Sequence, residues 1–524
     1  MGKAERIREQ KQERLVQTAA TAKKKGLNPK LKSILIGALS VVVIAALVAG
    51  IVVNTQRKNG TALKRADAIE VNGNTYKAAE VSFYYNTIVN QMSYQQQLYA
   101  AYGITAYNID FSQSLFEQTR DSDTGLSWGD YILDQAVQQL YTYVTLEEAG
   151  KAAGFEMPET GKTQLEETVA QLEESAAEQN VTAGMLLKAN YGNAITTELY
   201  KEYLSREIYA KLYGQSVGEG FEVTQNDIDT YYGEHKTDFD VVDYRSFSFT
   251  VELPEHLDEN GEQYSDDATK AEDEKLIAEA LADLKKRVEA VKSEDEFNEL
   301  AEEMTRGTDE DGEETEGVSA EETLKEGVGY SSLTTDMQTW MFDEAREAGD
   351  TNVASSSSTL TAYYFLNRDD RSELTRSVRH ILLSSEEEDE TIADKAQEIL
   401  DKWLAGDKTE ESFGALAAEY TEDTGSKETN GLYEKVMHGE MVSEFDEWLY
   451  DEARKPGDTE IIFSDDFGYH IMYYVGETDA TTRDVLVDAA IREERYAAYL
   501  EQLEEQYPLT KLSAGLDKIE KAEK

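Results

Sequence analysis

The spacing of apolar and polar positions predicts a mainly helical segment from residue 68 to about residue 240. Apolar residues recur there every three or four positions, which places them on one face of a helix. The clearest case runs from 127 to 150, where the apolar positions are Ile132, Leu133, Ala136, Val137, Leu140 and Val144. Ser127 and Asp130 have the spacing of a helix N-terminal cap. We therefore predict a helical domain at 68–240, which begins with a short hairpin at an Asn-Gly turn.

Two consecutive stretches further along the chain share a pattern that indicates an internal repeat. Thr339–Thr351 reads TWMFDEAREAGDT and Glu447–Thr459 reads EWLYDEARKPGDT, so eight of thirteen positions are identical. Each copy also begins and ends with strand-like runs. Duplication explains this match better than chance does. It predicts two related domains, at 243–370 and 376–478.

The second copy has the pattern of a small α+β domain. Strand-like runs at 378–384 and 469–475 enclose three segments with helical spacing, near 391–404, 410–420 and 441–453. The predicted order is strand, helix, helix, strand, helix, strand, strand.

The end of the chain returns to the helical pattern. Residues 482–508 predict one more helix, which ends at Pro508 and which we expect to pack on the helical domain. The charged tail at 509–524 that follows is expected to fray.

One segment near the N-terminus has the composition of a transmembrane helix. Ser33–Val53 contains 21 residues without a charge, and about 20 residues span a bilayer as a helix. Residues 1–32 contain ten Lys and Arg but three Glu, so the positive-inside rule places this tail in the cytoplasm and the main body outside. A cleaved signal peptide and a buried core helix are the alternatives. Because the apolar run exceeds the usual length of about 7–15 residues in a signal peptide, we expect an uncleaved single-pass anchor in the cell membrane.

The composition limits the partners of the main body. The chain has 106 Asp and Glu against 51 Lys and Arg, and such a surface repels nucleic acid and anionic headgroups. The same excess of acid also simply keeps a long chain soluble. Cysteine is absent, which excludes disulfides, thiolate nucleophiles and cysteine zinc sites. The sequence contains no phosphate-binding glycine loop and no metalloprotease motif, so we expect neither a cofactor nor a metal.

Four motifs of the second copy carry the candidate chemistry. They read VRHILL, EYTEDTGSKETNG, HGEMVSEFDEWLY and FGYHIMYYV, at Val378–Leu383, Glu419–Gly431, His438–Tyr450 and Phe467–Val475. In their order and approximate spacing they resemble the parvulin family of peptidyl-prolyl cis/trans isomerases, over nearly the whole domain. The resemblance implies a domain that catalyses rotation about the peptide bond before proline.

The resemblance also implies roles for the residues that match the motifs of the family. It implies that His380, Asp423 and His470 are catalytic, and that Met441 and Phe445 form an apolar floor that binds the proline ring. From the residues alone, other roles stay open. The two histidines could be structural, the aspartate could cap a turn, and the two apolar side chains could belong to a plain core.

One stretch of the second copy departs from the family. Asn430–Glu434 reads NGLYE where the family usually has Gly-Gly-Asp-Leu-Gly, so the geometry of this loop stays open, and we expect Leu432 to line the substrate pocket. The first copy departs further, since Ser246 and Ala362 stand where the second copy has its histidines. We expect the first copy to be a non-catalytic scaffold or a peptide-binding unit.

The whole arrangement resembles membrane-anchored extracytoplasmic foldases of the PrsA, PpiD and SurA type. That resemblance implies an α+β protein with one N-terminal transmembrane helix, a helical chaperone domain similar to those of SurA and trigger factor, and two parvulin-like domains. It also implies unfolded or partly folded exported polypeptides as partners. We predict an anchored isomerase and chaperone. The alternative is a holdase whose parvulin-like units are catalytically weak or inactive and only bind peptide.

Overall fold

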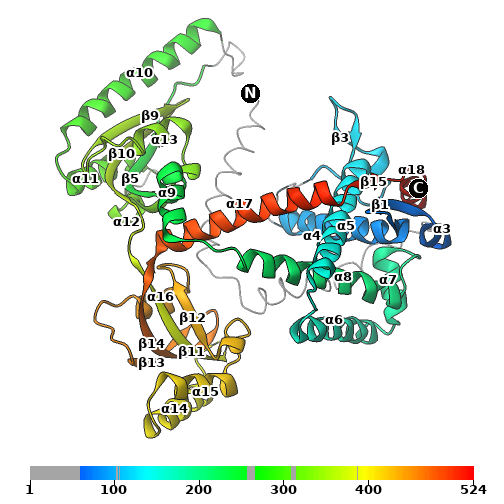
Figure 1. Cartoon of the computed structure of the whole chain (residues 1–524). Helices are drawn as coiled ribbons and strands as arrows, with labels where there is room; N and C mark the ends of the chain where they lie inside the picture. The colour runs from blue at the N-terminus through cyan, green and yellow to red at the C-terminus, as the bar shows by residue number, and fades with distance from the viewer. Residues whose placement is uncertain are drawn as a thin grey trace.

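The computed structural model describes most of the chain beyond the predicted membrane segment. The described residues are 60–101, 104, 107–256, 266–308, 314–385 and 387–523. They form a helical body and two units built on β-sheets, which α9 (Gln225–Phe239) and α17 (Thr482–Gln506) connect to the body (Figure 1). Within these residues no helix is both long and apolar enough to cross a membrane. The span expected at 33–53 and the tail at 1–32 lie outside the described residues.

The helical body holds one apolar core, to which each amphipathic helix contributes one face. Its elements before the sheet units are α3 (Gly60–Arg65), α4 (Ala78–Ala101), η2 (Leu115–Glu117), β3 (Thr119–Asp121), β4 (Leu126–Ser127), α5 (Trp128–Ala153), α6 (Glu159–Glu178), α7 (Ala183–Tyr191) and α8 (Thr197–Glu219). Tyr84, Leu140 and Tyr200 are among its fully buried side chains. Ser127 accepts a hydrogen bond from the N–H of Asp130 at the start of α5, as the sequence predicts.

The two ends of the described chain meet in the helical body. Strand β1 (Asp67–Val71) pairs with both β2 (Asn74–Lys77) and β15 (Leu509–Lys511) in one antiparallel sheet. Helix α18 (Ser513–Glu523) follows and buries Ile519 in the core. The expectation of a frayed tail at 509–524 is therefore wrong. Its few apolar residues are spaced to cover the sheet and α4, and this burial outweighs the charge of the segment.

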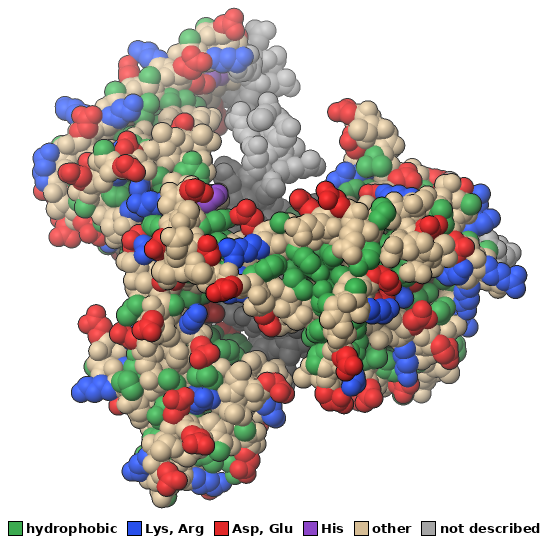
Figure 2. Space-filling model, viewed as in Figure 1, with side chains coloured by type: hydrophobic (Ala, Val, Ile, Leu, Met, Phe, Trp, Pro, Cys, Tyr) green, Lys and Arg blue, Asp and Glu red, His purple; other side chains and the backbone are tan. Residues whose placement is uncertain are grey.

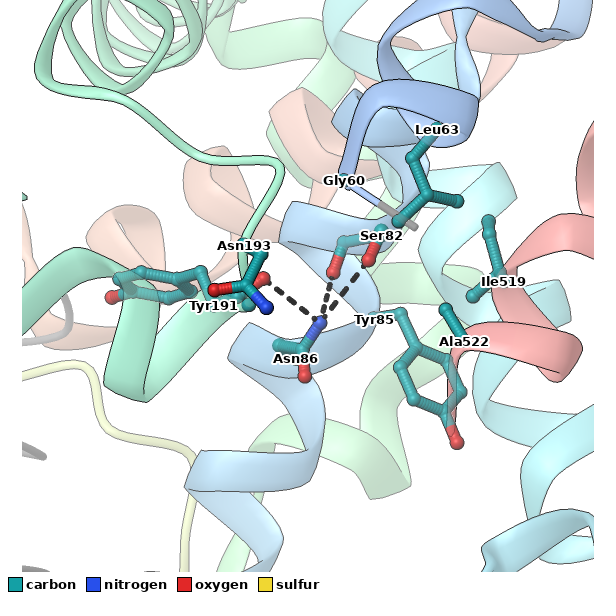
Figure 3. A pocket seen from close by; sticks show the side chains of 10 residues that line it. Gly60, Leu63, Ser82, Tyr85, Asn86, Tyr191, Asn193, Ile519 and Ala522 are labelled. Carbon is teal, nitrogen blue, oxygen red and sulfur yellow. Dashed lines mark hydrogen bonds between the residues drawn. The ribbon is translucent and has the colours of Figure 1, made fainter. Parts of the chain in front are cut away.

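A small cavity lies where α3, α4 and α18 approach one another (Figure 3). Asn86 closes it on one side, donating hydrogen bonds to the carbonyl groups of Ser82 and Tyr191. Its volume is about 30 Å³, which is room for one water molecule. We do not regard this cavity as a ligand site.

The two sheet units have the same strand order. The first contains β5 (Val241–Thr250), α10 (Asp267–Ala290), α11 (Glu294–Thr305), β6 (Gly307–Thr308), β7 (Glu314–Thr315), α12 (Ala320–Thr323), β8 (Leu324–Gly329), η3 (Tyr330–Ser332), α13 (Thr335–Met341), β9 (Thr351–Ser356) and β10 (Thr359–Asp369). The second contains β11 (Leu374–Ser384), α14 (Glu390–Ala405), α15 (Glu410–Tyr420), η4 (Lys427–Thr429), β12 (Leu432–Val436), α16 (Ser443–Leu449), β13 (Thr459–Ser464) and β14 (Gly468–Thr481). Their sheets run β8-β5-β10-β9 and β12-β11-β14-β13, which is the arrangement that the internal repeat predicts.

The first strands of the two copies align through a shared ion pair. Arg245 on β5 and Arg379 on β11 each contact the glutamate that begins the second helix of their own copy. The next residues, Ser246 and His380, therefore occupy equivalent positions. The first copy thus lacks the histidine of β11.

The last strands align one residue away from the expected position. His470 lies opposite Leu382, two residues after the first histidine. In the first copy the equivalent position, opposite Ser248, belongs to Thr361 and not to Ala362. The reason is a difference in turn length, because three residues connect β13 to β14 and two connect β9 to β10.

Helices cover both faces of the second sheet. On one face α14 and α15 enclose a core that includes Ile381, Phe413 and Ile471. On the other face α16 and the loop before it pack over a second core that includes Val378 and Met472. The sheet is therefore the middle layer of the unit, and its two faces carry different side chains.

The junction between the body and the sheet units is built on α9 and α17. Ile228, Val487 and Ile491 form a small apolar core between the two helices. Arg492 on α17 donates hydrogen bonds to three carbonyl groups, two in the last turn of α8 and one in the segment that follows it. Further along α17, the hydroxyl of Tyr499 lies 2.8 Å from that of Tyr213 in the helical body. Apolar side chains are visible on the surface where α17 meets this body (Figure 2).

Candidate active site

Two neighbouring antiparallel strands bring the predicted histidines together. His380 on β11 lies opposite Met472, and His470 on β14 lies opposite Leu382. Because alternate residues of a strand share a face, both rings point to the face that α16 covers. Each histidine is 4% exposed, and the two ring centroids are 5.4 Å apart.

A continuous chain of hydrogen bonds joins the histidines to Asp423, which lies in the loop after α15. Atom Nε2 of His380 is 2.8 Å from Oδ2 of Asp423, and its Nδ1 is 3.2 Å from Nδ1 of His470. Atom Nε2 of His470 is in turn 3.1 Å from Oγ of Ser464. The structure therefore brings together all three residues that the sequence proposes as catalytic.

One placement of protons satisfies every atom of this chain. The Nε2–H of His380 donates to Asp423, the Nδ1–H of His470 donates to His380, and the hydroxyl of Ser464 donates to His470. All four ring nitrogens are then used within the protein, so neither ring has a nitrogen free for a substrate. This geometry favours the structural alternative for the two histidines, in which they position the carboxylate of Asp423.

The surroundings determine the charges of this chain. Burial lowers the pKa of His470 to about 3; a proton added to His380 would act in the same direction, and the charge of Asp423 acts against it. Burial acts to raise the pKa of Asp423, but the hydrogen bond from His380, the positive charge that this ring carries when protonated, and the hydroxyl of Ser426 outweigh it and hold this pKa below its usual range. At neutral pH the site therefore holds a carboxylate next to a neutral second histidine.

Three polar side chains of the site were not predicted. Oδ2 of Asp423 also accepts hydrogen bonds from the hydroxyls of Ser426, at 2.5 Å, and Tyr433, at 2.9 Å, and Ser464 ends the chain at the second histidine. Ser426 lies in the same motif as Asp423, three positions later, and hydroxyl residues commonly bond a carboxylate in this local range. Ser464 has no such signal, because it reaches the site through strand pairing.

An apolar floor lies directly beside the polar chain. The ring of Phe445 on α16 meets both histidines edge-on, with ring centroids 5.4 Å from His380 and 5.6 Å from His470. Phe445 is buried in a core with Val378, and half-buried Met441 packs against the same core. Of the two residues that the sequence proposes for proline binding, Phe445 thus contacts both histidines, and Met441 packs against the core that contains Phe445.

Leu432 is the exception among the predicted site residues. It pairs with Arg379 on β11, whereas the next residue, Tyr433, pairs with Val378. Paired residues share a face, so Leu432 faces α14 and α15, away from the histidines. The half-buried ring of Tyr433 lies on the histidine side, 5.5 Å from the ring of His380. The expectation that Leu432 lines the pocket is therefore wrong, and Tyr433 occupies that place.

No metal site accompanies this arrangement within the part of the chain that the structure describes. Among the described residues, no group of three or more histidine, aspartate or glutamate side chains is arranged to hold an ion. The exposed His438 lies apart from the hydrogen-bonded chain and contacts Asp446.

The first copy keeps the apolar floor without the polar chain. Ser246 and Thr361 replace the two histidines, and Gly307 replaces Asp423 at the second position after the matching threonine. Met337, at the position of Phe445, is buried in the matching apolar core. The first copy thus retains a surface for apolar groups but not the carboxylate.

Comparison with known proteins identifies the second sheet unit. Residues 380–476 match the family model described as "Rotamase: PPIC-type PPIASE domain". The matched segment begins at the first histidine, runs through the whole candidate site and ends after β13 and most of β14.

Curated relatives match part of this chain. Foldase protein PrsA of Halalkalibacterium halodurans is 33% identical over 123 residues, which are 23% of this chain and 31% of that protein. Foldase protein PrsA 1 of Listeria monocytogenes is 32% identical over 137 residues, 26% of this chain and 41% of that protein. Chaperone SurA of Hahella chejuensis is 33% identical over 118 residues, 22% of this chain and 26% of that protein. The chain spans less than half the length of each of these relatives.

Solved structures include PrsA from Bacillus subtilis, which is 13% identical and aligns with 78% of this chain and 92% of its own, with a TM-score of 0.26. PrsA from Bacillus anthracis is 26% identical over 26% of this chain and 59% of its own, with a TM-score of 0.18. Residues 380–476 match the family model and contain the whole hydrogen-bonded chain from Asp423 to Ser464, and they therefore form a parvulin domain of the PPIC-type peptidyl-prolyl isomerase family.

Proposed function

We propose that this chain is a membrane-anchored peptidyl-prolyl cis/trans isomerase and chaperone that assists the folding of exported proteins. The observation that carries the proposal is the single site where Asp423, positioned by His380, adjoins the apolar floor under Phe445. Rotation of a peptide bond next to this carboxylate would need no cofactor.

The reaction requires little from the protein beyond shape and electrostatics. Rotation about a peptide bond before proline has a barrier of about 18–20 kcal/mol, and no covalent bond has to break. A catalyst must hold the proline ring and stabilise the twisted amide, which has lost resonance. In our proposal Met441 and Phe445 hold the ring, and the fixed negative charge of Asp423 acts next to the rotating bond.

The chaperone part of the proposal rests on the helical body and the first sheet unit. We propose that the body, with α17 as its last long helix, is a chaperone domain similar to those of SurA and trigger factor. The first unit keeps an apolar floor around Met337, which suits a unit that binds peptide without isomerising it. Relatives named foldase and chaperone support this assignment.

The proposed location rests on the sequence. Ser33–Val53 is long and apolar enough for one span, and the basic residues 1–32 favour a cytoplasmic N-terminus. The described body would then lie outside the membrane, where exported polypeptides emerge. Absence of cysteine suits an oxidising compartment.

A second candidate is a holdase that binds unfolded chains without catalysis. It is favoured by one observation, the loss of all three polar positions in the first unit, which shows that this fold persists in the chain without the site. If the second unit is also inactive, substitutions in its site will leave the suppression of aggregation intact.

The two candidates are separated by a refolding assay that is limited by proline isomerisation, using the full chain in detergent. We expect the wild-type chain to accelerate refolding, His380→Ala to abolish the acceleration, and Ser246→Ala, the matched change in the first unit, to leave it unchanged. Suppression of aggregation should persist in both variants. A wild-type chain that refolds no substrate faster than the uncatalysed rate would refute the isomerase assignment.

A further inference from the structure

Tyr433 is a residue of the second unit whose chemistry departs from the parvulin pattern. Aligned from Asn430, the stretch NGLYE places Tyr433 at the leucine of Gly-Gly-Asp-Leu-Gly. A leucine can contribute an apolar wall alone. A tyrosine adds a hydroxyl, and in this site that hydroxyl has a partner.

The hydroxyl of Tyr433 donates to Oδ2 of Asp423 at 2.9 Å. The same oxygen accepts from His380 and Ser426, while Oδ1 accepts from the N–H of Gly425. Four donors from four positions therefore hold one carboxylate. Three of them come from its own loop or from β11, and Tyr433 alone ties it to β12.

Gly425 makes room for this contact. A Cβ atom at Gly425 would lie 2.6 Å from the hydroxyl oxygen of Tyr433, which is closer than any alanine could tolerate without displacing the phenol. The backbone of Gly425 does not have a positive φ, so the local conformation accepts other residues. The need for glycine here comes from the hydroxyl.

We propose that Tyr433 is a positioning residue of the isomerase site, which fixes the carboxylate of Asp423 against β12 while its ring forms part of the pocket wall. This inference rests on the proposed function. One consequence is that Gly425 and Tyr433 act as a pair. The first unit has no counterpart of this contact, because Lys325 lies at the position equivalent to Tyr433.

The pair also affects the titration of the carboxylate. The groups around Asp423 that carry charge or titrate are His380 on β11, His470 on β14 and Tyr433 on β12, with Glu440 close to Tyr433 from the following loop. Burial raises the pKa of Tyr433, and the negative charge of Asp423 raises it further, so the phenol stays protonated and donates at every pH of interest. Loss of this donor removes a stabilising contact of the ionised carboxylate, and the pKa of Asp423 must then rise.

The test compares Tyr433→Phe, Gly425→Ala and the double variant in the full chain. The first removes only the hydroxyl, and the second forces the hydroxyl away. We expect each single change to lower kcat/KM for isomerisation by about tenfold, since a hydrogen bond to a charged group is lost, and to move the acid limb of its pH profile upward. Because both changes break the same contact, the double variant should be no worse than either. Tyr450→Phe, which removes a hydroxyl bonded to the carbonyl of Val436, is the matched control and should keep the wild-type profile.

A second readout does not depend on activity. With aspartate labelled at the carboxyl carbon, the signal of Asp423 is identified by its absence in Asp423→Asn and titrated in wild type and in Tyr433→Phe. We expect its midpoint to rise in the variant. An unchanged midpoint, or effects of the two single changes that add in the double variant, would overturn the inference about Tyr433. A wild-type chain without isomerase activity would instead overturn the proposed function, while the carboxyl titration would still decide the role of the hydroxyl.

Discussion

Lowering the pH from 7 to 5 should destabilise the second sheet unit, because His470 is buried in a form that resists protonation. Its pKa is lowered from 6.5 to about 3 in the folded unit. In the unfolded chain the same histidine binds a proton near its ordinary pKa. Acid therefore favours the unfolded state, the loss of stability begins near pH 6.5, and it levels off below about pH 3.

The size of the effect follows from these two values. A pH of 5 lies about 1.5 units below the ordinary pKa of His470. The histidine is therefore protonated in the unfolded chain, while in the folded unit it is still neutral. At about 1.4 kcal/mol per unit, the second unit loses about 2 kcal/mol between pH 7 and pH 5. Asp423 has a lowered pKa and stays ionised over this interval, so it contributes no opposing change.

Hydrogen exchange measured by mass spectrometry can test this within one molecule. After correction for the intrinsic effect of pH, amides of β11 and β14 should lose protection on acidification, whereas β5 and β10 should not, since Ser246 and Thr361 do not titrate there. His470→Gln should lower protection at both pH values but remove the difference between them. Asp446, whose pKa burial raises, affects wild type and variant equally. The reasoning fails if the variant keeps the wild-type pH dependence, or if both sheets respond alike.

Other substitutions probe separate parts of the fold. Ile519→Ala should lower the unfolding free energy of the helical body by about 3 kcal/mol in urea denaturation, because the side chain is buried in its core; no change would mean that α18 does not dock. Arg379→Gln should cost about 2 kcal/mol and expose the loop to limited proteolysis, since it removes donors to the carbonyl groups of Thr429 and Asn430; an uncleaved loop would contradict this. Ser464→Ala should cost about 1 kcal/mol by leaving a buried ring nitrogen without its donor, visible as faster exchange in β14 but not in β10.

The helices were the most predictable part of the fold. Helical spacing predicts α5 and α15 closely, and a capping residue also marks the start of α5. In both helices the local pattern and the packing favour the same structure. The order of elements in the second unit also follows from its sequence. These features depend on residues near one another in the chain.

The errors come from strand pairing, which depends on residues far apart. Neighbouring residues of a strand point to opposite faces of the sheet. Tyr433 therefore lies on the face of the histidines and Leu432 on the other face. A one-residue difference in a hairpin turn likewise makes Thr361, and not Ala362, the counterpart of the second histidine. Neither the face nor the turn length is visible in a local pattern.

The sequence predicts which residues form the candidate site better than it predicts what each of them does. His380, Asp423 and His470 do meet, Phe445 contacts the two histidines, and Met441 packs against the core of Phe445. The role of each residue follows only from the structure, because the distances show that every nitrogen of the two histidine rings has a hydrogen-bond partner within the protein. The sequence does not predict that the segment after Pro508 packs on the helical body, because charged residues dominate its composition. Ile519 nevertheless lies on the face of α18 that packs into the core.

The pairing of β1 with β15 has a consequence for the order in which this protein can fold. Synthesis delivers β1 first and β15 more than four hundred residues later, so the helical body lacks a strand and a helix until the last residues have been made. Each sheet unit, in contrast, draws all its strands from one continuous stretch and can close as soon as that stretch is complete. During synthesis the two inserted units should therefore become compact while the body that carries them is still open, and a chain stalled before residue 509 should hold two finished units on an unfinished support.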